Sequence, residues 1–305
     1  MDLDGILLID KRVGYTSFET VERVRKKICA RKAGHAGTLD KAASGLLIVC
    51  INRGTVVQQL FTSEFKVYRA EIVFGLETDT LDRYGRIIRT GTVRCFKNGE
   101  IESVLERFKG RGFQIPPEFS AIHLHGKRLY RKVIDGERVE IAPREIEIEN
   151  IVLMRNMGSG IRIEVCASKG TYIRALSRDI ASNLGTCGYV AYLRRIKIGP
   201  FSVDQALSPD EVTPSTSIIP LDEAIKHLPY IELGQEFAPF VLRGVPLRKI
   251  LKKSVDCTLK TSGIRFKEDL FKKPYGFIRV ICEGKLLAIV RGDEAFSYVR
   301  VLRDP

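Results

Sequence analysis

Two stretches of the chain alternate regularly between apolar and polar side chains. They span residues 66–75 and 161–167. Their apolar positions fall on one face of each stretch: Tyr68, Ala70, Ile72, Phe74, and Ile161, Ile163, Val165, Ala167. A period of two predicts half-buried β-strands. Shorter apolar runs predict further strands at residues 5–10, 46–51 and 190–198.

Helical patterns occupy three segments. Thr16-Ser17-Phe18-Glu19 fits a capping box, and apolar residues recur behind it at helical spacing: Phe18, Val21, Val24 and Ile28. Residues 101–108 predict a short amphipathic helix. Residues 172–183 predict a longer helix that ends at Gly185.

The last 75 residues differ from the rest of the chain. We expect a domain boundary near Pro229, with one domain at 1–230 and a second at 231–305. Three strands are predicted in the second domain, at residues 276–282, 285–291 and 296–303. A tight Glu283-Gly284 turn joins the first two, and such closely spaced strands are typical of a small β-barrel.

Charge and cysteine content narrow the class of partner. The 305 residues carry a formal net charge of +13, and an excess of this size favours polyanions such as nucleic acid. The seven cysteines are odd in number and form no CxxC pair, so neither a zinc ribbon nor a disulfide framework is expected. Reduced thiols fit a cytoplasmic location. The N-terminus does not resemble a signal peptide, and no apolar run is long enough to cross a membrane.

Candidate chemistry is concentrated in residues 34–45, GHAGTLDKAASG, where Asp40 is the only acid of a glycine-rich loop. A carboxylate placed this way can act as a nucleophile or base, or it can simply cap a turn. Arg174, at the start of the helix predicted at 172–183, is a candidate cationic partner. Taken singly, Arg174 is also typical of a surface salt bridge, and Tyr68 and Leu193 are typical of a core.

Several familiar sites are absent from the sequence. The glycine loop has neither the GK[ST] of a P-loop nor GxGxxG, and the chain has no GxSxG and no HExxH. His123 and His125 lie one residue apart with no third ligand nearby, so we expect no metal.

A basic insertion spans about residues 116–145. Between Pro116 and Pro143 its cations are Lys127, Arg128, Arg131, Lys132 and Arg138, interleaved with Tyr130. This composition suits a flexible arm that grips RNA, and equally a solvated loop.

Taken together, these stretches resemble the TruB family of tRNA pseudouridine synthases. The similarity is carried, in order along the chain, by DGILLIDKRVGYTS, GHAGTLDKAASGLLIVC, KVYRAEIVFGLETDTLDRYG, PPEFSAIHLHGKRLYR, KGTYIRALSRDIASNLG and YLRRIKIGPF. The C-terminal part resembles the small PUA RNA-binding domain, mainly through its strands and GKLLAIVR. The resemblance implies an α+β fold with a mixed, mostly antiparallel sheet, flanking helices and a central cleft, plus a C-terminal β-barrel.

The resemblance also implies an activity and a set of residues. The family isomerises uridine 55 in the T-loop of tRNA to pseudouridine, and needs neither cofactor nor metal. By this carry-over the catalytic residues are Asp40, the nucleophile, Tyr68, which stacks on the uracil and assists proton transfer, and Arg174, which pairs with Asp40. The remaining positions carried over are His35, which fills the space left by the flipped base, Tyr172 and Leu193, which line the pocket, and Asp82 and Lys11. Lys127, Arg128, Arg131 and Lys132 fall in the RNA-gripping insertion.

Two positions depart from the family pattern. Lys41 and Arg12 stand where the family usually has proline, which changes loop stiffness and leaves the reacting groups in place. The sequence leaves three paths open for Asp40: attack on the ribose, attack on the base, or removal of a ribose proton.

Two other functions compete with this one. A pseudouridine synthase acting on ribosomal RNA has a similar nucleophile loop, but His35 and PPEFSA favour the TruB pattern, and we expect no separate RNA-binding domain before the strand at Gly5. A non-catalytic tRNA folding chaperone would have no need for Asp40, Tyr68 and Arg174 together. We expect a monomer, because binding one tRNA requires no symmetry.

Overall fold

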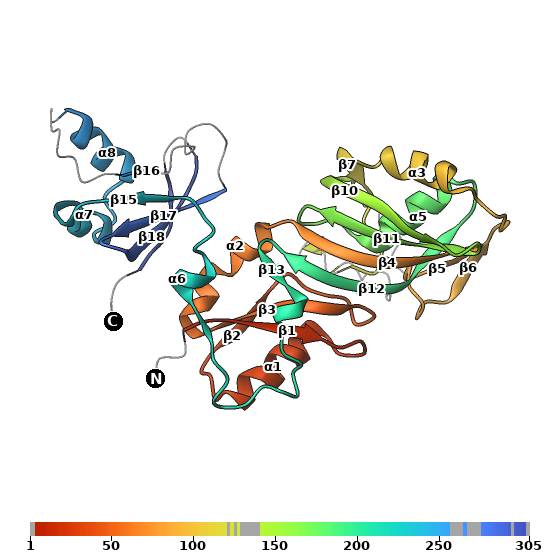
Figure 1. Ribbon diagram of the computed structural model, residues 1–305, viewed down its shortest axis with the longest axis horizontal. Helices are drawn as coiled ribbons and strands as arrows, with labels where there is room; N and C mark the ends of the chain where they lie inside the picture. Colours follow the sequence, from red (N-terminus) through yellow and green to blue (C-terminus); the bar gives the residue numbers. More distant parts are fainter. Residues whose placement is uncertain are drawn as a thin grey trace. The chain divides into compact units, whose positions relative to one another are not determined.

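The computed structural model describes residues 4–120, 123–124, 127–128, 141–256, 265–266, 276–293 and 296–302 (Figure 1). The chain divides into two compact units. One contains Leu7–Ser217, and the other contains Met1–Ile6 with Ile218–Pro305. Each unit has its own sheet and its own hydrophobic core.

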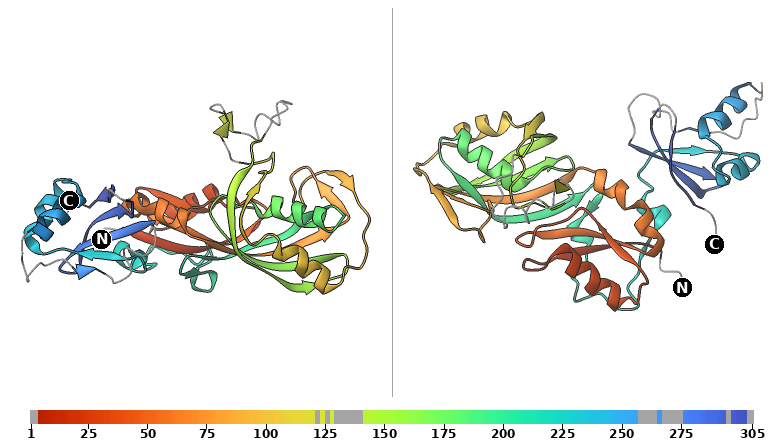
Figure 2. Two further views of the ribbon diagram at one scale, coloured as in Figure 1. Left: turned by 90° about the horizontal axis from the view of Figure 1, so that it is seen from above. Right: turned by 180° about the vertical axis from the view of Figure 1, so that it is seen from behind.

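The large unit is built on one long mixed sheet (Figures 1 and 2). Its strands lie in the order β1, β3, β12, β4, β11, β10, β7, with β2 paired to β3 and β13 to β12. The short strand β14 extends this order beside β1, where Ile219 and Pro220 pair with Ile6 and Gly5, and these four residues belong to the small unit. Their bounds are β1 Gly5–Lys11, β2 Ala33–Ala36, β3 Ser44–Ile51, β4 Lys66–Phe74, β7 Gly110–Gln114, β10 Arg144–Asn156, β11 Gly160–Ala167, β12 Gly188–Ile198, β13 Phe201–Ser202 and β14 Ile219–Pro220. β12 runs antiparallel to β4 and parallel to β3. The expected mixed, mostly antiparallel sheet is confirmed.

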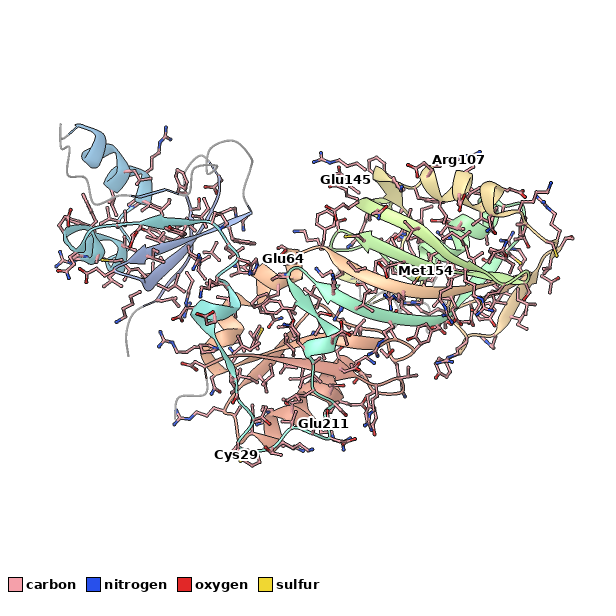
Figure 3. All side chains as sticks on the ribbon, in the orientation of Figure 1. Cys29, Glu64, Arg107, Glu145, Met154 and Glu211 are labelled. Carbon is pink, nitrogen blue, oxygen red and sulfur yellow. The ribbon has the colours of Figure 1, made fainter. Side chains whose placement is uncertain are left out.

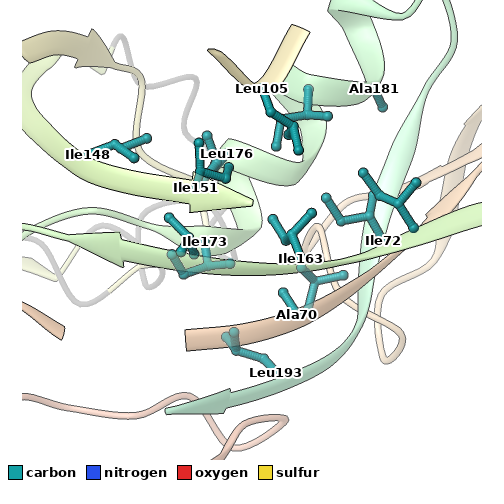
Figure 4. Close-up of a cluster of buried hydrophobic side chains, with 14 of the residues drawn as sticks. Ala70, Ile72, Leu105, Ile148, Ile151, Ile163, Ile173, Leu176, Ala181 and Leu193 are labelled. Carbon is teal, nitrogen blue, oxygen red and sulfur yellow. The ribbon is translucent and has the colours of Figure 1, made fainter. Parts of the chain in front are cut away.

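The alternation at residues 66–75 produces the expected two-sided strand. Ala70, Ile72 and Phe74 are buried, whereas Arg69 is exposed. Helices α3 (Asn98–Glu106) and α5 (Ile173–Asn183) pack on the apolar face, where their side chains meet those of β4, β10 and β11. Figure 4 shows Ile151, Leu176 and Ile163 in this core. Figure 3 labels Met154 of β10, which is 46% exposed.

Helix α1 (Ser17–Lys27) confirms the capping box but corrects the predicted apolar face. The Thr16 side chain accepts from the Glu19 amide, and the Glu19 carboxylate accepts from the Thr16 amide. Val21 and Val24 are buried as expected, but Phe18 is 70% exposed. Ser17 faces inward instead, because its hydroxyl is hydrogen-bonded to the backbone of Leu39.

Shorter elements complete the large unit. They are the 3₁₀ helix at Asn52–Val57, α2 (Gln58–Ser63), the hairpin of β5 (Leu76–Thr78) and β6 (Ile87–Thr90), the two-residue pair β8 (His123–Leu124) and β9 (Lys127–Arg128), and the 3₁₀ helix at Val203–Gln205.

The small unit contains a separate five-stranded sheet, ordered β16, β15, β17, β18, β19. The bounds are β15 Tyr230–Glu232, β16 Arg265–Phe266, β17 Phe277–Cys282, β18 Lys285–Arg291 and β19 Tyr298–Val301, with helices α6 Leu221–Ala224, α7 Ala238–Leu242 and α8 Leu247–Asp256 and a 3₁₀ helix at Gln235–Phe237. The predicted tight turn lies between β17 and β18, with positive φ at Glu283 (49°) and Gly284 (77°). This separate sheet is consistent with a PUA-like domain.

Candidate active site

The loop between β2 and β3, residues 37–43, presents Asp40. A Cβ at Gly45 would lie 2.2 Å from the carbonyl oxygen of Arg195, and Gly45 has φ +105°. Only glycine suits this position, because β12 runs directly beside the start of β3. The glycine therefore lets β3 begin directly beside the paired backbone of β12.

Four hydrogen bonds fix the backbone on both sides of Asp40. The Leu39 amide donates to Ser17 Oγ at 2.8 Å, and the same hydroxyl donates to the Leu39 carbonyl at 3.1 Å. The Ala43 amide closes a turn on the Asp40 carbonyl at 3.0 Å, and the Gly14 amide donates to the Lys41 carbonyl at 2.9 Å. The carboxylate is thus held on an anchored loop, although its side chain is 40% exposed.

Arg174 contacts both oxygens of that carboxylate. Its Nε donates to Oδ2 at 2.8 Å and its Nη2 to Oδ1 at 3.3 Å. The rest of the guanidinium is held by backbone carbonyls, Thr80 at 2.7 Å from Nη1 and Phe119 at 3.0 Å from Nη2. Arg174 is 5% exposed and lies in the first turn of α5, so the cation is rigidly placed before any ligand arrives.

A cleft of about 1040 Å³ opens beside Asp40. Tyr68, Tyr172 and Leu193, three of the residues carried over from the resemblance, line it. The remaining lining residues are Thr16, Gly37, Thr38, Leu39, Lys41, Thr62, Lys66, Phe119, Ser120, Arg144, Ser168, Lys169, Gly170, Thr171, Ile173 and Arg195. The structure therefore brings Asp40, Tyr68, Tyr172, Leu193 and, through its ion pair, Arg174 to one place.

Tyr172 is positioned from two sides. It caps the N-terminus of α5, and its backbone exchanges two hydrogen bonds with the Gln114 side chain, at 2.8 and 3.1 Å. Burial raises the pKa of the Tyr172 phenol, so the side chain is a neutral ring at physiological pH.

Besides Arg174, which reaches the cleft only through its ion pair with Asp40, three of the residues carried over for substrate binding are not part of the cleft lining: Lys11, Asp82 and His35. Lys11 is fully buried, and its amine donates to the carbonyls of Arg12 (3.0 Å) and Tyr15 (2.7 Å). Burial lowers the pKa of Lys11 to about 8, and Asp40 partly opposes this shift. Asp82 Oδ1 accepts from the Thr80 hydroxyl (2.8 Å) and the Tyr84 amide (2.9 Å), so it shapes the loop whose Thr80 carbonyl holds Arg174.

His35 lies on β2, paired with Val49 of β3. Burial, followed by the charge of Arg195, lowers the pKa of its imidazole. Its Nδ1 is buried and has no hydrogen-bond partner among the residues that the structure describes. The ring is neutral at physiological pH.

Sequence reasoning missed two buried cations of the cleft, Lys66 and Arg195. The position of each residue on its strand explains why it is buried. Lys66 shares the inward face of β4 with Tyr68 and Ala70, and Arg195 shares a face of β12 with Leu193. A charged residue on the buried face of an otherwise apolar strand was the available signal.

The basic insertion at about residues 116–145 is only partly described. Lys127 and Arg128 form the short strand β9, paired with β8. Arg131 and Lys132 lie outside the described residues, so their predicted role is untested. Within the described ranges, no cluster of three or more His, Cys, Asp or Glu side chains could hold a metal, and no helix is long and apolar enough to cross a membrane.

Two solved structures share the fold of this chain. A chain in the crystal structure of a Cbf5-Nop10-Gar1 complex has a TM-score of 0.69 at 24% identity, covering 95% of this chain and 78% of that one. A chain in the archaeal box H/ACA sRNP Nop10-Cbf5 complex has a TM-score of 0.68 at 21% identity, covering 99% and 86%. At these identities the similarity shows that the chains share a fold, and nothing beyond the fold.

Sequence comparison then defines the family. Residues 25–173 match the profile of the TruB family pseudouridylate synthase (N terminal domain). The chain is 40% identical to tRNA pseudouridine synthase B of Aquifex aeolicus over 262 residues, 83% of this chain and 89% of that protein. It is 37% identical to tRNA pseudouridine synthase B of Caldanaerobacter subterraneus over 250 residues, 81% and 87% of the two chains. The chain belongs to the TruB family of pseudouridylate synthases.

Proposed function

We propose that this protein converts a uridine of tRNA to pseudouridine, and that its target is uridine 55 in the T-loop. Two similar proteins, each matched over more than four fifths of its length, carry the name tRNA pseudouridine synthase B. The net charge of +13 suits an RNA substrate.

One observation carries the catalytic assignment: Asp40, on an anchored loop, is gripped through both oxygens by Arg174 at the edge of the cleft. In this proposal Asp40 is the catalytic residue, and Arg174 positions it. The carboxylate needs no reorganisation when the substrate arrives, which is the condition for an efficient reaction.

The isomerisation breaks the N1–C1′ bond, rotates the detached uracil and forms a C5–C1′ bond. The proton on C5 is lost and N1 gains one, so atoms and electrons balance without a co-reactant. Asp40 attacks the ribose, attacks the base or removes a ribose proton, and all three paths give the same product.

The aromatic and apolar lining has its own task. A base inside a folded RNA must leave its stack before Asp40 can reach the nucleotide, which costs a few kcal/mol. Stacking on Tyr68 recovers about 1–3 kcal/mol. Tyr172 and Leu193 then confine the uracil while it turns, and His35 fills the space left in the RNA.

The other parts of the chain serve RNA binding in this proposal. Residues 1–230 form the catalytic domain, the insertion at about 116–145 grips the T-stem-loop, and residues 231–305 form a PUA-like domain that binds RNA. Asp82 stabilises the loop whose Thr80 carbonyl accepts a hydrogen bond from Arg174. Lys11 stabilises the turn next to the Asp40 loop by donating to two of the turn's carbonyls. We further propose a cytoplasmic monomer that uses neither a nucleotide cofactor nor a metal.

The test is pseudouridine formation on an unmodified tRNA T-stem-loop transcript, mapped by nucleotide, with wild type and Asp40→Asn side by side. Product at the T-loop uridine with the wild type alone, together with equal RNA affinity of both proteins, supports the proposal. Binding without product in either protein favours a folding chaperone. Product only on a ribosomal RNA fragment favours the other synthase class.

A further inference from the structure

Three cations line one part of the cleft wall: Lys66 of β4, Arg195 of β12 and Lys169, which precedes α5. Lys66 and Arg195 are 4% and 1% exposed, whereas Lys169 is exposed. None of the three takes part in the pairing of Asp40 with Arg174. They therefore form a feature distinct from the Asp40–Arg174 pair.

Lys66 and Arg195 converge beneath the Gly37 turn. A Cβ built on Gly37 would lie 3.4 Å from Arg195 Nη1 and 3.9 Å from Lys66 Cε. Arg195 is fixed there by Nε, which donates to the Leu46 carbonyl at 2.8 Å, and by Nη2, which donates to the Gly37 carbonyl at 3.0 Å. Lys66 donates to the carbonyls of Thr62 and Glu64. Both side chains are thus held by the backbone, close to each other.

The positive charge of this group is not neutralised within it. Among the residues that the structure describes, no carboxylate forms an ion pair with Lys66, Lys169 or Arg195. Burial lowers the pKa of Lys66 to about 8, and the charges of Arg195 and Lys169 act in the same direction, opposed by Glu64. The three side chains therefore repel one another. Asp40, the carboxylate of this cleft, is already paired with Arg174.

Buried cations are stable when an anion or a full set of hydrogen bonds compensates them. Arg195 keeps Nη1 uncommitted among the described residues, and the Lys66 amine has a third N–H. A guanidinium and an ammonium side by side match the oxyanions of a phosphate group. The cleft already faces a polyanionic substrate, since each nucleotide that enters it carries a phosphodiester.

We infer that Lys66, Lys169 and Arg195 form a phosphate seat, which binds a backbone phosphodiester next to the extruded uridine. This inference rests on the proposed function. Phosphate contacts fix register and orientation without reading sequence. A phosphate held at this seat would set where the ribose stands relative to Asp40, so Lys66, Lys169 and Arg195 are positioning residues.

The experiment measures binding of a T-stem-loop RNA at several salt concentrations, for wild type, Lys169→Met, Lys66→Met and the control Lys197→Met. Lys197 is an exposed lysine on β12 that lines no part of this cleft. We expect Lys169→Met and Lys66→Met each to reduce the magnitude of the slope of log K against log salt by about 0.7–1. We also expect Lys66→Met to weaken RNA binding about tenfold. Lys197→Met should match the wild type.

A modified substrate identifies the phosphate. The linkage 5′ or 3′ of the target uridine is replaced by a neutral methylphosphonate, with a 2′-O-methyl group at the same position in both RNAs compared. At the linkage whose phosphate binds to the seat, the methylphosphonate should weaken RNA binding by the wild type. Binding by Lys169→Met, which is already weaker, should fall little further with the same RNA. Because Lys169 is exposed, this variant keeps the test decisive if Lys66→Met fails to fold.

The outcomes separate the two proposals. The phosphate seat is overturned if the wild type forms product but the lysine substitution and the methylphosphonate weaken binding additively at both linkages. It is also overturned if the wild type forms product and the salt slopes of Lys169→Met and Lys66→Met equal that of Lys197→Met. In both cases the synthase assignment stays intact. If the wild type makes no pseudouridine but binding effects are non-additive, the seat holds and the proposed reaction fails.

Discussion

Arg174 and Asp40 lie 134 residues apart in the sequence and meet in a two-point ion pair, with Nε–Oδ2 at 2.8 Å and Nη2–Oδ1 at 3.3 Å. The carbonyls of Thr80 and Phe119 occupy the outer side of the guanidinium. The side chain therefore joins the loop that carries Asp40, the loop after β5 and the start of the basic insertion. Its role is geometric as well as electrostatic.

Replacing Arg174 by lysine tests the geometric part. A lysine keeps the charge but cannot bind two carboxylate oxygens and two carbonyls at once. We expect kcat for pseudouridine formation to fall by about 100-fold or more, because a misplacement of about 1 Å is enough for such a loss. RNA affinity should change far less than kcat. Single-turnover kinetics at saturating RNA measure the first quantity and a binding titration the second.

The matched control is Arg178→Lys, one turn further along α5. Arg178 pairs with Asp179 and donates to the Ile115 carbonyl, and it lines no part of the cleft. Its replacement should leave kcat within about threefold of wild type. A kcat for Arg174→Lys as high as that of Arg178→Lys would show that charge alone suffices.

Ser17→Ala tests the support beneath Asp40. The hydroxyl is buried and serves both the amide and the carbonyl of Leu39. Its removal leaves buried backbone groups without a partner, which costs about 1–3 kcal/mol of unfolding free energy. Ser63→Ala, which removes one exposed hydrogen bond to Gln59, should cost less than about 0.5 kcal/mol. Denaturant unfolding measures both, and equal values would contradict the anchoring role of Ser17.

Much of the fold could be predicted where one face of an element is apolar. The alternation of β4 and β11 and the capping box of α1 are local signals, and the structure confirms them. β7 was not predicted, because this edge strand, GRGFQ, buries only Gln114 and owes its conformation to pairing with β10. Phe18 was placed on the wrong face, because the inward position beside it is held by a hydrogen bond that hydrophobic spacing cannot reveal.

The candidate site likewise has a part that the sequence predicts and a part that it does not. Asp40, Tyr68, Tyr172, Arg174 and Leu193 were carried over from short motifs, and the structure brings them together. Lys66 and Arg195 were missed because they stand out only once they are known to be buried. Their burial depends on the packing of strands that are far apart in the sequence. The ion pair of Asp40 with Arg174 could be proposed, but its two-point geometry depends on carbonyls from two further loops.

Gly45→Ala tests the close pairing of β3 with β12 at the end of the Asp40 loop. The added methyl group would lie 2.2 Å from the Arg195 carbonyl oxygen, and the backbone φ of +105° is itself unfavourable for alanine. We expect a loss of more than about 3 kcal/mol in unfolding free energy, or failure to fold. Gly112→Ala is the control, because no atom lies within 4 Å of its added Cβ and its φ is not positive. It should change stability by less than about 0.5 kcal/mol. A tolerated Gly45→Ala would mean that β3 and β12 can separate at this point.

His35 predicts a specific acid sensitivity. Burial and the charge of Arg195 lower the pKa of its imidazole below the ordinary 6.5, whereas the unfolded chain keeps the ordinary value. Just below pH 6.5 the unfolded state therefore binds more protons at this residue than the folded state, so the unfolding free energy falls as the pH is lowered. His35→Gln removes this contribution. Denaturant unfolding of both proteins between pH 8 and pH 5 should give curves that run parallel above about pH 7 and converge below pH 6.5, as the wild type loses stability faster. Other titrating groups are common to both proteins and cancel in the difference. Parallel curves over the whole range would mean that His35 becomes protonated in the folded protein as easily as in the unfolded chain.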